Sequence, residues 1–191
     1  MNNVDISKAT DVAAASLMAT GRGTESIGAG GVYTVECVGA DGQVKWTDTF
    51  HNLVVNQGLQ DMNTKYFKGS TYTAAWYVGL VTGPGSGNTY AAGDTLATHA
   101  GWTETAAYSG TRKTATFGTA TTADPSVISN SASVASFAMN ATVTVAGAFL
   151  SSVDSGTSGI LFSVGSFTGG DKFVDSGDTL NVTYTFSLDA V

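Results

Sequence analysis

The chain has 191 residues, of which 42% are hydrophobic and 12% are charged, a composition that is typical of a folded protein and not of a disordered one. This length allows one good core, so a second complete domain is not expected. The formal net charge is −7 and the eight Lys and Arg residues are scattered, which disfavours a nucleic-acid-binding protein.

No stretch of the sequence approaches the length of a transmembrane helix, which needs about 20 mostly apolar residues. The first residues lack the basic start of a secretory signal, and the apolar stretch 12–18 is short and weakly apolar. We therefore expect a protein that is made in a cytoplasm and does not associate with a membrane.

Residues 1–30 are polar and rich in alanine, and they end in the hinge-like sequence Gly-Ala-Gly-Gly at 28–31. Asp11 would cap a short helix through Val12, Ala15 and Met18, but an alanine-rich helix of this length is marginally stable on its own. The sequence predicts an N-terminal arm over residues 1–30 that contacts a partner surface. A single folded domain is predicted over residues 31–191.

The domain begins with a predicted β-hairpin. Residues 32–38 and 44–50 flank the segment 39–42, in which Asp41-Gly42 favours a tight turn. Cys37 lies in the first of these strands. It is the only cysteine, so it cannot form an intramolecular disulfide, and we predict that it is buried as a small apolar residue.

One helix is predicted after the hairpin, with Asn52 as its N-cap and Gly69 as its stop. Val54, Val55 and Gly58 lower the helix propensity of its first turns. Apolar residues at helical spacing predict that one side of the helix is buried. They are Leu53, Leu59 and Met62, with Tyr66 or Phe67.

Residues 74–81 are almost continuously apolar and predict a strand that is buried on both faces. The long polar region 83–109 follows, and loops of this length usually have a function or make interactions. Three further strands are predicted at 113–117, 133–139 and 142–150.

The last part of the chain reads as two alternating strands joined by a Gly- and Asp-rich connection. In residues 160–167 the apolar row is interrupted by Gly165, where a bulge fits. In residues 179–188 the even-numbered positions are apolar and the odd-numbered ones are polar, which predicts one buried and one wet face. The wet face carries hydroxyls and an amide, and we expect it to contact neighbouring subunits. The predicted fold is mainly β, an antiparallel β-sandwich or jelly-roll-like domain with one short helix and an extended N-terminal arm.

Candidate catalytic and metal sites were weighed against structural roles. His99, Trp102 and Glu104 with nearby serines would suit a hydrolase, but no serine lies in a Gly-x-Ser-x-Gly turn. Asp171, Asp175 and Asp178 match no EF-hand spacing, and Asp is ordinary in Gly-rich turns. We therefore predict no catalytic residues, no metal and no cofactor, and a hydrolase remains an alternative.

Trp102, Tyr90 and Tyr108 lie in or next to the long polar region, where an exposed aromatic ring can stack on a sugar. They are the candidate residues for contact with a glycan or a protein partner. Burial in the core or a subunit contact is favoured over glycan binding for each of them.

Several short runs resemble small virion proteins of tailed bacteriophages. They are HNLVVNQGL at 51–59, AWYVGL at 75–80, AAGDT at 91–95, SNSAS at 129–133, GGDK at 169–172 and SGDTL at 176–180. The resemblance covers residues 31–188 and excludes the arm. It implies a non-enzymatic structural role on the capsid surface, as a capsid decoration or cement protein.

The resemblance also implies the partners of the protein, which would be the major capsid protein and further copies of this chain, with a trimer as one arrangement. It does not separate the head of the particle from its tail. A tail- or fibre-associated structural protein therefore remains an alternative, as does a carbohydrate-binding β module.

Overall fold

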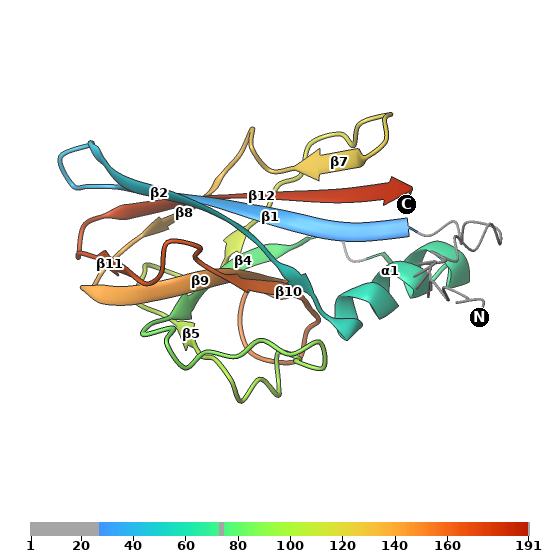
Figure 1. Cartoon of the computed structure of the whole chain (residues 1–191), viewed down its shortest axis with the longest axis horizontal. Helices are drawn as coiled ribbons and strands as arrows, with labels where there is room; N and C mark the ends of the chain where they lie inside the picture. Colours follow the sequence, from blue (N-terminus) through green and yellow to red (C-terminus); the bar gives the residue numbers. More distant parts are fainter. Residues whose placement is uncertain (1–26, 73–74, 191) are drawn as a thin grey trace, which may run out of the picture.

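The first of two antiparallel sheets is built around the two longest strands of the chain. The computed structural model describes residues 27–72 and 75–190. In this sheet the strand order is β2-β1-β12-β7, and β8 also pairs with β12 (Figure 1). The strands are β1 (Ile27–Val38), β2 (Val44–His51), β7 (Ser126–Ser129), β8 (Ala135–Ala138) and β12 (Thr179–Ala190).

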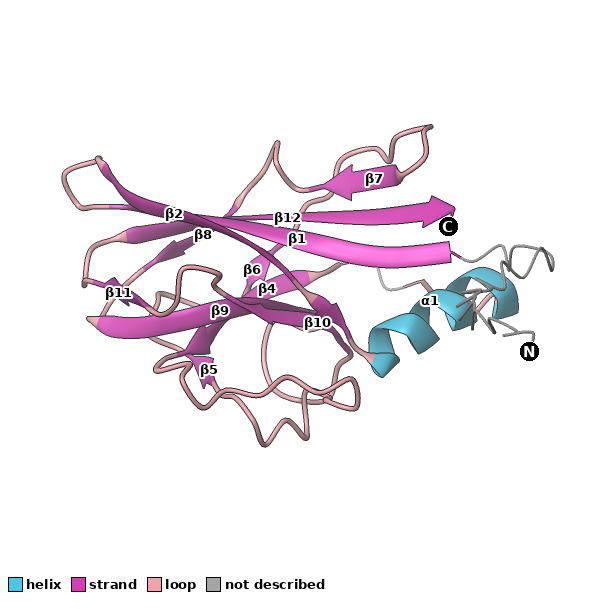
Figure 2. Ribbon diagram, in the orientation of Figure 1, coloured by secondary structure: helices cyan, strands magenta, loops and turns pink. Residues whose placement is uncertain are grey.

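The second sheet has the order β3-β10-β9-β4-β5, with β11 pairing with β9 and β6 pairing with β4. Its strands are β3 (Leu53–Val54), β4 (Tyr77–Thr82), β5 (Glu104–Thr105), β6 (Lys113–Thr114), β9 (Val143–Ser151), β10 (Leu161–Ser166) and β11 (Lys172–Val174). Helix α1 (Asn56–Lys68) follows β3 and lies at the end of the molecule where β1 begins and β12 ends (Figure 1, Figure 2).

The two sheets pack face to face, which confirms the predicted mainly β sandwich with one helix. The alternation of β12 accounts for much of this core, because Leu180, Val182 and Tyr184 are fully buried. Farther along the strand Phe186 and Leu188 are only half-buried. The predicted buried row therefore extends as far as Tyr184, and Phe186 lines a groove that is open at this end.

Strand β4 is buried on both faces, as predicted. Val78 and Leu80 point into the core between the sheets, whereas Val81 belongs to a second apolar cluster on the other face of the same sheet. Leu96 and Trp102, from the long region 83–109, complete this second cluster. The long region therefore acts as a third layer that covers the second sheet.

The N-terminal part of the prediction needs correction. Ile27 to Gly31 are not a hinge but the first residues of β1, and they pair in register with β12 from Ala190 to Phe186. A glycine-rich sequence suits this strand because a Cβ on Gly31 would overlap the buried ring of Tyr184. The rest of the predicted arm, residues 1–26, lies outside the described residues.

The helix begins later than predicted. Leu53 and Val54 form β3 and pair with β10, and the N-cap is Val55, whose side chain makes no capping hydrogen bond. The β-branched residues at this point favour a strand over a helical turn. Gly58 is buried because the helix approaches the backbone of Phe162 too closely for a Cβ. The helix stops at Gly69, as predicted.

Other boundaries also differ from the prediction. Only two residues of the predicted strand 113–117 pair with a neighbouring strand, and they form β6. This strand shares one edge of β4 with β5, which leaves each of them room for two residue pairs. The short strands β7 and β11 were not predicted, since neither has a clear alternation of apolar side chains. The irregularity in β10 lies between Leu161 and Ser163 and not at Gly165. Strands β10 and β12 belong to opposite sheets, and their connection contains β11.

Adjacent glycines in β1 offer a test of the packing of Tyr184. A Cβ on Gly31 would lie 2.7 Å from Cε2 and 2.8 Å from Cζ of Tyr184, whereas a Cβ on Gly30 would meet nothing within 4 Å. We expect Gly31→Ala to lower the free energy of unfolding by about 1–3 kcal/mol through overpacking. Gly30→Ala, the matched control, should change it by less than about 0.5 kcal/mol. Urea unfolding measures both, and equal midpoints for the two variants would contradict this packing.

Candidate functional site

The outer face of α1 exposes two aromatic side chains. Tyr66 is 83% exposed and Phe67 is 77% exposed, and their rings contact each other edge to face at a centroid distance of 4.9 Å. Leu59 on the same helix and Ile27 at the start of β1 are also exposed. Large apolar side chains gathered at one end of a protein usually mark a surface that contacts a partner. We call Tyr66 and Phe67 the aromatic pair.

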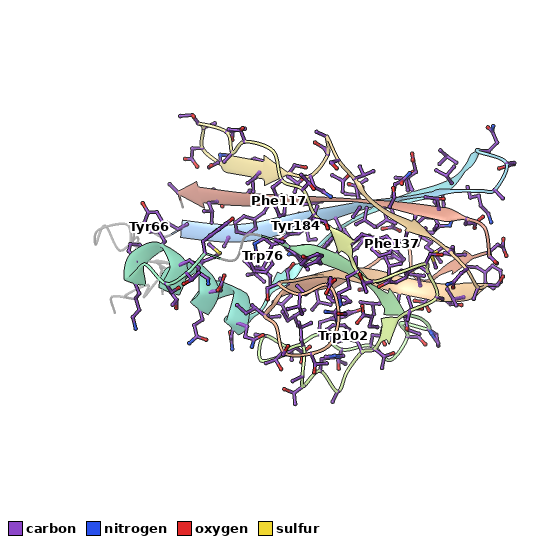
Figure 3. All side chains as sticks on the ribbon, turned by 180° about the vertical axis from the view of Figure 1, so that it is seen from behind. Tyr66, Trp76, Trp102, Phe117, Phe137 and Tyr184 are labelled. Carbon is purple, nitrogen blue, oxygen red and sulfur yellow. The ribbon has the colours of Figure 1, made fainter. Side chains whose placement is uncertain are left out.

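An open groove of about 230 Å³ lies between α1 and the two sheets. Its apolar wall consists of Trp76, Phe117, Ile128, Phe162, Tyr184 and Phe186, and we call it the aromatic groove. Figure 3 shows Trp76, Phe117 and Tyr184 close together between the strands, with Tyr66 farther out on the helix. The groove and the aromatic pair are therefore neighbouring but different surfaces.

The wall of the groove is held in place by ring-to-ring contacts. Phe162 contacts Trp76 at a centroid distance of 5.3 Å and Phe186 at 5.4 Å, both nearly edge to face. Phe117 contacts Tyr184 in the same way at 6.2 Å. Such geometries are favourable for aromatic pairs beyond the area that they bury. The wall is thus formed before any ligand arrives.

Tyr184 connects the groove to the polar interior of the sandwich. Its hydroxyl accepts hydrogen bonds from Asn52 Nδ2 at 2.9 Å and from Ser163 Oγ at 3.4 Å. Ser163 also shares a hydrogen bond with Tyr33, whose ring packs against that of Tyr184 at 4.6 Å. Burial raises the pKa of Tyr184, and the hydrogen bonds from Ser163 and Asn52 oppose this change. The phenol therefore stays neutral at physiological pH.

Charged residues of α1 form the rim of the groove. Asp61 and Lys65 are one helical turn apart, and Oδ1 of Asp61 lies 3.8 Å from Nζ of Lys65. Lys65 Nζ also donates to the carbonyl of Thr71 and so ties the segment after the helix to its last turns. Tyr72 follows on this segment, lines the groove and is largely exposed.

Trp102 and Tyr90, two of the predicted contact residues, lie together, but Trp102 is only 3% exposed. Its ring packs on Phe149, and its Nε1 donates to the carboxylate of Asp94 at 3.0 Å. Tyr90 is half-buried beside it. Trp102 therefore anchors the long loop on the second sheet, in agreement with the burial that the sequence favoured.

Tyr108, the third predicted contact residue, lies in a different place. It is buried in the core between the sheets, where it contacts Phe137 edge to face at 4.8 Å. Its hydroxyl donates to Glu104 at 3.4 Å. In the isolated chain Trp102 and Tyr108 do not share a surface, so a sugar would meet them only at separate positions.

The residues considered for a hydrolase are used in structural contacts. His99 stacks on Trp102 at 4.0 Å, and its Nδ1 lies 2.9 Å from the Trp102 carbonyl oxygen. Glu104 accepts two hydrogen bonds from the buried Arg112, at 2.9 and 2.7 Å. Arg112 also donates to the carbonyls of Val153 and Gly156, so it fastens two loops to each other.

The three aspartates of the Gly-rich connection do not converge on one point. Asp171 accepts from the backbone N–H of Gly85, whereas Asp175 and Asp178 both accept from Lys45 Nζ, at 2.7 and 2.8 Å. Asp178 also accepts from the N–H of Asp175 and so closes a turn. Over residues 27–72 and 75–190, no three His, Cys, Asp or Glu side chains gather to hold a metal ion.

The long edge strand β2 is partly covered. The backbone N–H groups of Thr168 and Gly169 each donate to Asp48 at 3.0 Å, and the Thr168 hydroxyl donates to the carbonyl of Thr49 at 3.1 Å. Lys172 adds a salt bridge to Asp48. An inward-pointing charge and a covering loop are common protections against edge-to-edge pairing. Docking through β2 is therefore less favoured than docking at α1.

Sequence reasoning missed both surfaces near α1. The helical spacing of Leu59 and Met62 with Tyr66 or Phe67 predicted one buried side. Met62 does pack, partly buried, against the core, but Leu59, Tyr66 and Phe67 are exposed. The buried positions of the helix are Gly58 and Asp61. A small residue at the closest approach to a sheet was the available signal for this orientation. The groove itself is lined by four strands, by α1 and by residues of connecting segments, and no local pattern could have predicted it.

Comparisons with known proteins return no match to a protein family, a curated protein or a solved structure. Within the part of the chain that the structure describes, no helix has the length and the apolar character needed to cross a membrane.

The turn at Asp178 predicts a specific dependence of stability on pH. Burial alone would raise the pKa of Asp178, but hydrogen bonds from Lys45 and from the N–H of Asp175 hold it below its usual value of 3.8. The folded protein thus binds this proton less tightly than the unfolded chain does. Asp178 therefore stabilises the fold above about pH 4, and this stabilisation is lost as the pH falls through the lowered pKa.

We expect Asp178→Asn to lower stability at neutral pH and to flatten the decline of stability below about pH 4. Thermal unfolding followed by circular dichroism at a series of pH values measures this. Asp154→Asn, on an exposed loop, is the control and should keep the decline of the parent protein. An unchanged decline in Asp178→Asn would contradict the assigned role.

The burial of Cys37 next to Asp178 predicts how its thiol reacts. Burial, with the nearby negative charge of Asp178, raises the pKa of the Cys37 thiol to about 12. The thiolate is the reactive form, so the native protein should not react with iodoacetamide at about pH 8. Mass spectrometry should find full alkylation only in denaturing urea. Rapid alkylation of the native protein would contradict the burial of Cys37.

Proposed function

We propose that this protein is a non-enzymatic structural protein of a bacteriophage virion, a capsid decoration or cement protein on the capsid surface. It would bind the major capsid protein and further copies of itself, without a cofactor. The observation that carries the proposal is the exposed aromatic pair on α1, at the end of the molecule where β1 begins. Exposed, neighbouring aromatic rings of this kind are typical of the centre of a protein–protein interface.

The outer face of the first sheet supports the same role. Hydroxyl and amide side chains bond to each other across its strands, with Thr34 to Thr49 at 3.1 Å and Thr185 to Ser129 at 3.0 Å. This face offers hydrogen bonds that carry no net charge, and salt screens such bonds little. Many weak contacts of this kind become strong when a symmetric lattice repeats them.

The sequence resemblance supports the assignment to a virion, and the fold is compatible with it. The contacts of Trp102, His99 and Glu104 support a structural role for the long loop, because each of these side chains already stabilises the isolated chain. A decoration protein needs only a stable scaffold and a docking surface. The sandwich and its α1 end supply both.

We expect the protein to co-purify with bacteriophage particles on a density gradient, with on the order of hundreds of copies per particle. Quantitative mass spectrometry of the particle band measures the copy number. A dozen copies or fewer would place the protein at the neck or fibre instead of the head. Its complete absence from the particle band would contradict the proposal.

The aromatic pair can be tested on particles that are produced without this protein. We expect the double variant Tyr66→Ser with Phe67→Ser to bind them about 30-fold or more weakly than the parent protein, because central aromatic residues of an interface typically contribute at least about 2 kcal/mol. Phe173→Ser is the matched control, since Phe173 is also largely exposed but lies on β11, away from α1. Equal binding by all three proteins would exclude α1 as the docking surface.

A further inference from the structure

The aromatic groove is a hydrophobic site that the described residues leave open. A dry apolar cavity of roughly 150 Å³ already binds benzene in a protein core, and this groove is larger, at about 230 Å³. The rim charges Asp61 and Lys65 are paired with each other, so the apolar wall offers no free charge to a ligand. An occupant of this groove must therefore be apolar and uncharged along the part that enters it.

Residues 12–18 of this chain are mostly apolar and uncharged, as an occupant of the groove must be. Their sequence, VAAASLM, has six apolar residues out of seven, and no charge occurs between Asp11 and Arg22. Val12, Leu17 and Met18 supply branched and flexible side chains that suit an irregular aromatic wall. We propose that the aromatic groove binds residues 12–18 of the same chain, so that the N-terminal segment covers it.

The register of β1 and β12 places the start of the described chain near the groove. Phe186, which lines the groove, pairs with Gly31, and Ile27 lies four residues farther along β1. At the rise of a strand, this separation is about 13 Å. Ile27, where the described part of the chain begins, therefore lies a short distance from the groove, at the same end of the molecule as α1 (Figure 1).

The length of the connection suits an intramolecular contact. Eight residues lie between Met18 and Ile27, and they include Gly21 and Gly23. By random-coil scaling, a chain of eight residues has a root-mean-square end-to-end distance of about 16 Å, close to the span to be crossed. The effective concentration of a tethered segment is highest when these two lengths match. Binding within one chain is therefore favoured over binding of the same segment from a second copy.

A spin label at position 10 tests this contact in the full-length protein. Thr10→Cys introduces a reactive thiol next to the proposed segment, whereas Cys37 is buried and should stay unlabelled. We expect the label to broaden the amide NMR signals of Phe117, Ile128 and Phe186. The double change Leu17→Asp with Met18→Asp in the same labelled protein should reduce this broadening several-fold, because a carboxylate cannot enter the apolar groove without a partner.

The double change Val4→Asp with Ile6→Asp is the matched control, since it introduces the same two negative charges into the N-terminal region but outside residues 12–18, and it should leave the broadening unchanged. Equal broadening in the parent and in the Leu17→Asp, Met18→Asp protein would overturn the proposal. A mixture of isotope-labelled protein without the spin label and spin-labelled protein without the isotope tests the second copy. Broadening in that mixture would also overturn it, because the segment would then come from a neighbouring chain.

Discussion

The pairing of β1 with β12 is the interaction on which the rest of the structure depends. Twelve residue pairs join these strands. In the same sheet β2 pairs with β1, whereas β7 and β8 pair with β12. Tyr33 and Tyr184, opposite each other in this pairing, stack in the centre and bond through Ser163 to the second sheet. Contacts between residues so distant in sequence have a high entropic cost of loop closure. The pairing of β1 with β12 therefore requires almost the whole chain between them to be ordered together.

The same pairing makes the two ends of the sandwich different. At one end β1 turns into β2, and Lys45 of β2 forms salt bridges with Asp175 and Asp178 in the turn between β11 and β12, next to the buried Cys37. At the other end β1 and β12 continue beyond the fully buried core residues. Helix α1, which follows β3 of the second sheet, lies at this end. Gly58 brings the helix onto β10, Tyr66 and Phe67 face outward, and a groove remains between the helix and the sheets. The closed end stabilises the fold, and the open end offers surfaces for contact.

Local patterns in the sequence were sufficient for the strands with regular alternation and insufficient for the helix. The hairpin at Gly39–Gly42, the burial of Cys37 and both buried faces of β4 followed from alternation, turn residues and apolar runs. The face of α1 did not, since a close approach to β10 outweighed the helical spacing of apolar residues. Trp102 was expected to be buried or in a contact, but its partner Asp94 depends on the fold of the whole loop. Surfaces assembled from several strands, such as the aromatic groove, have no signature in any single segment.

We propose above all that this β-sandwich contacts a capsid lattice through the end of the molecule where α1 lies. Hydrogen–deuterium exchange of the protein, free in solution and bound to particles, tests it most directly, because exchange of each backbone amide reports whether that amide becomes protected. We expect new protection on particles to be greatest at α1 and the segment that follows it, with little change in the loop 83–109. New protection confined to that loop, with α1 exchanging as in the free protein, would contradict the account.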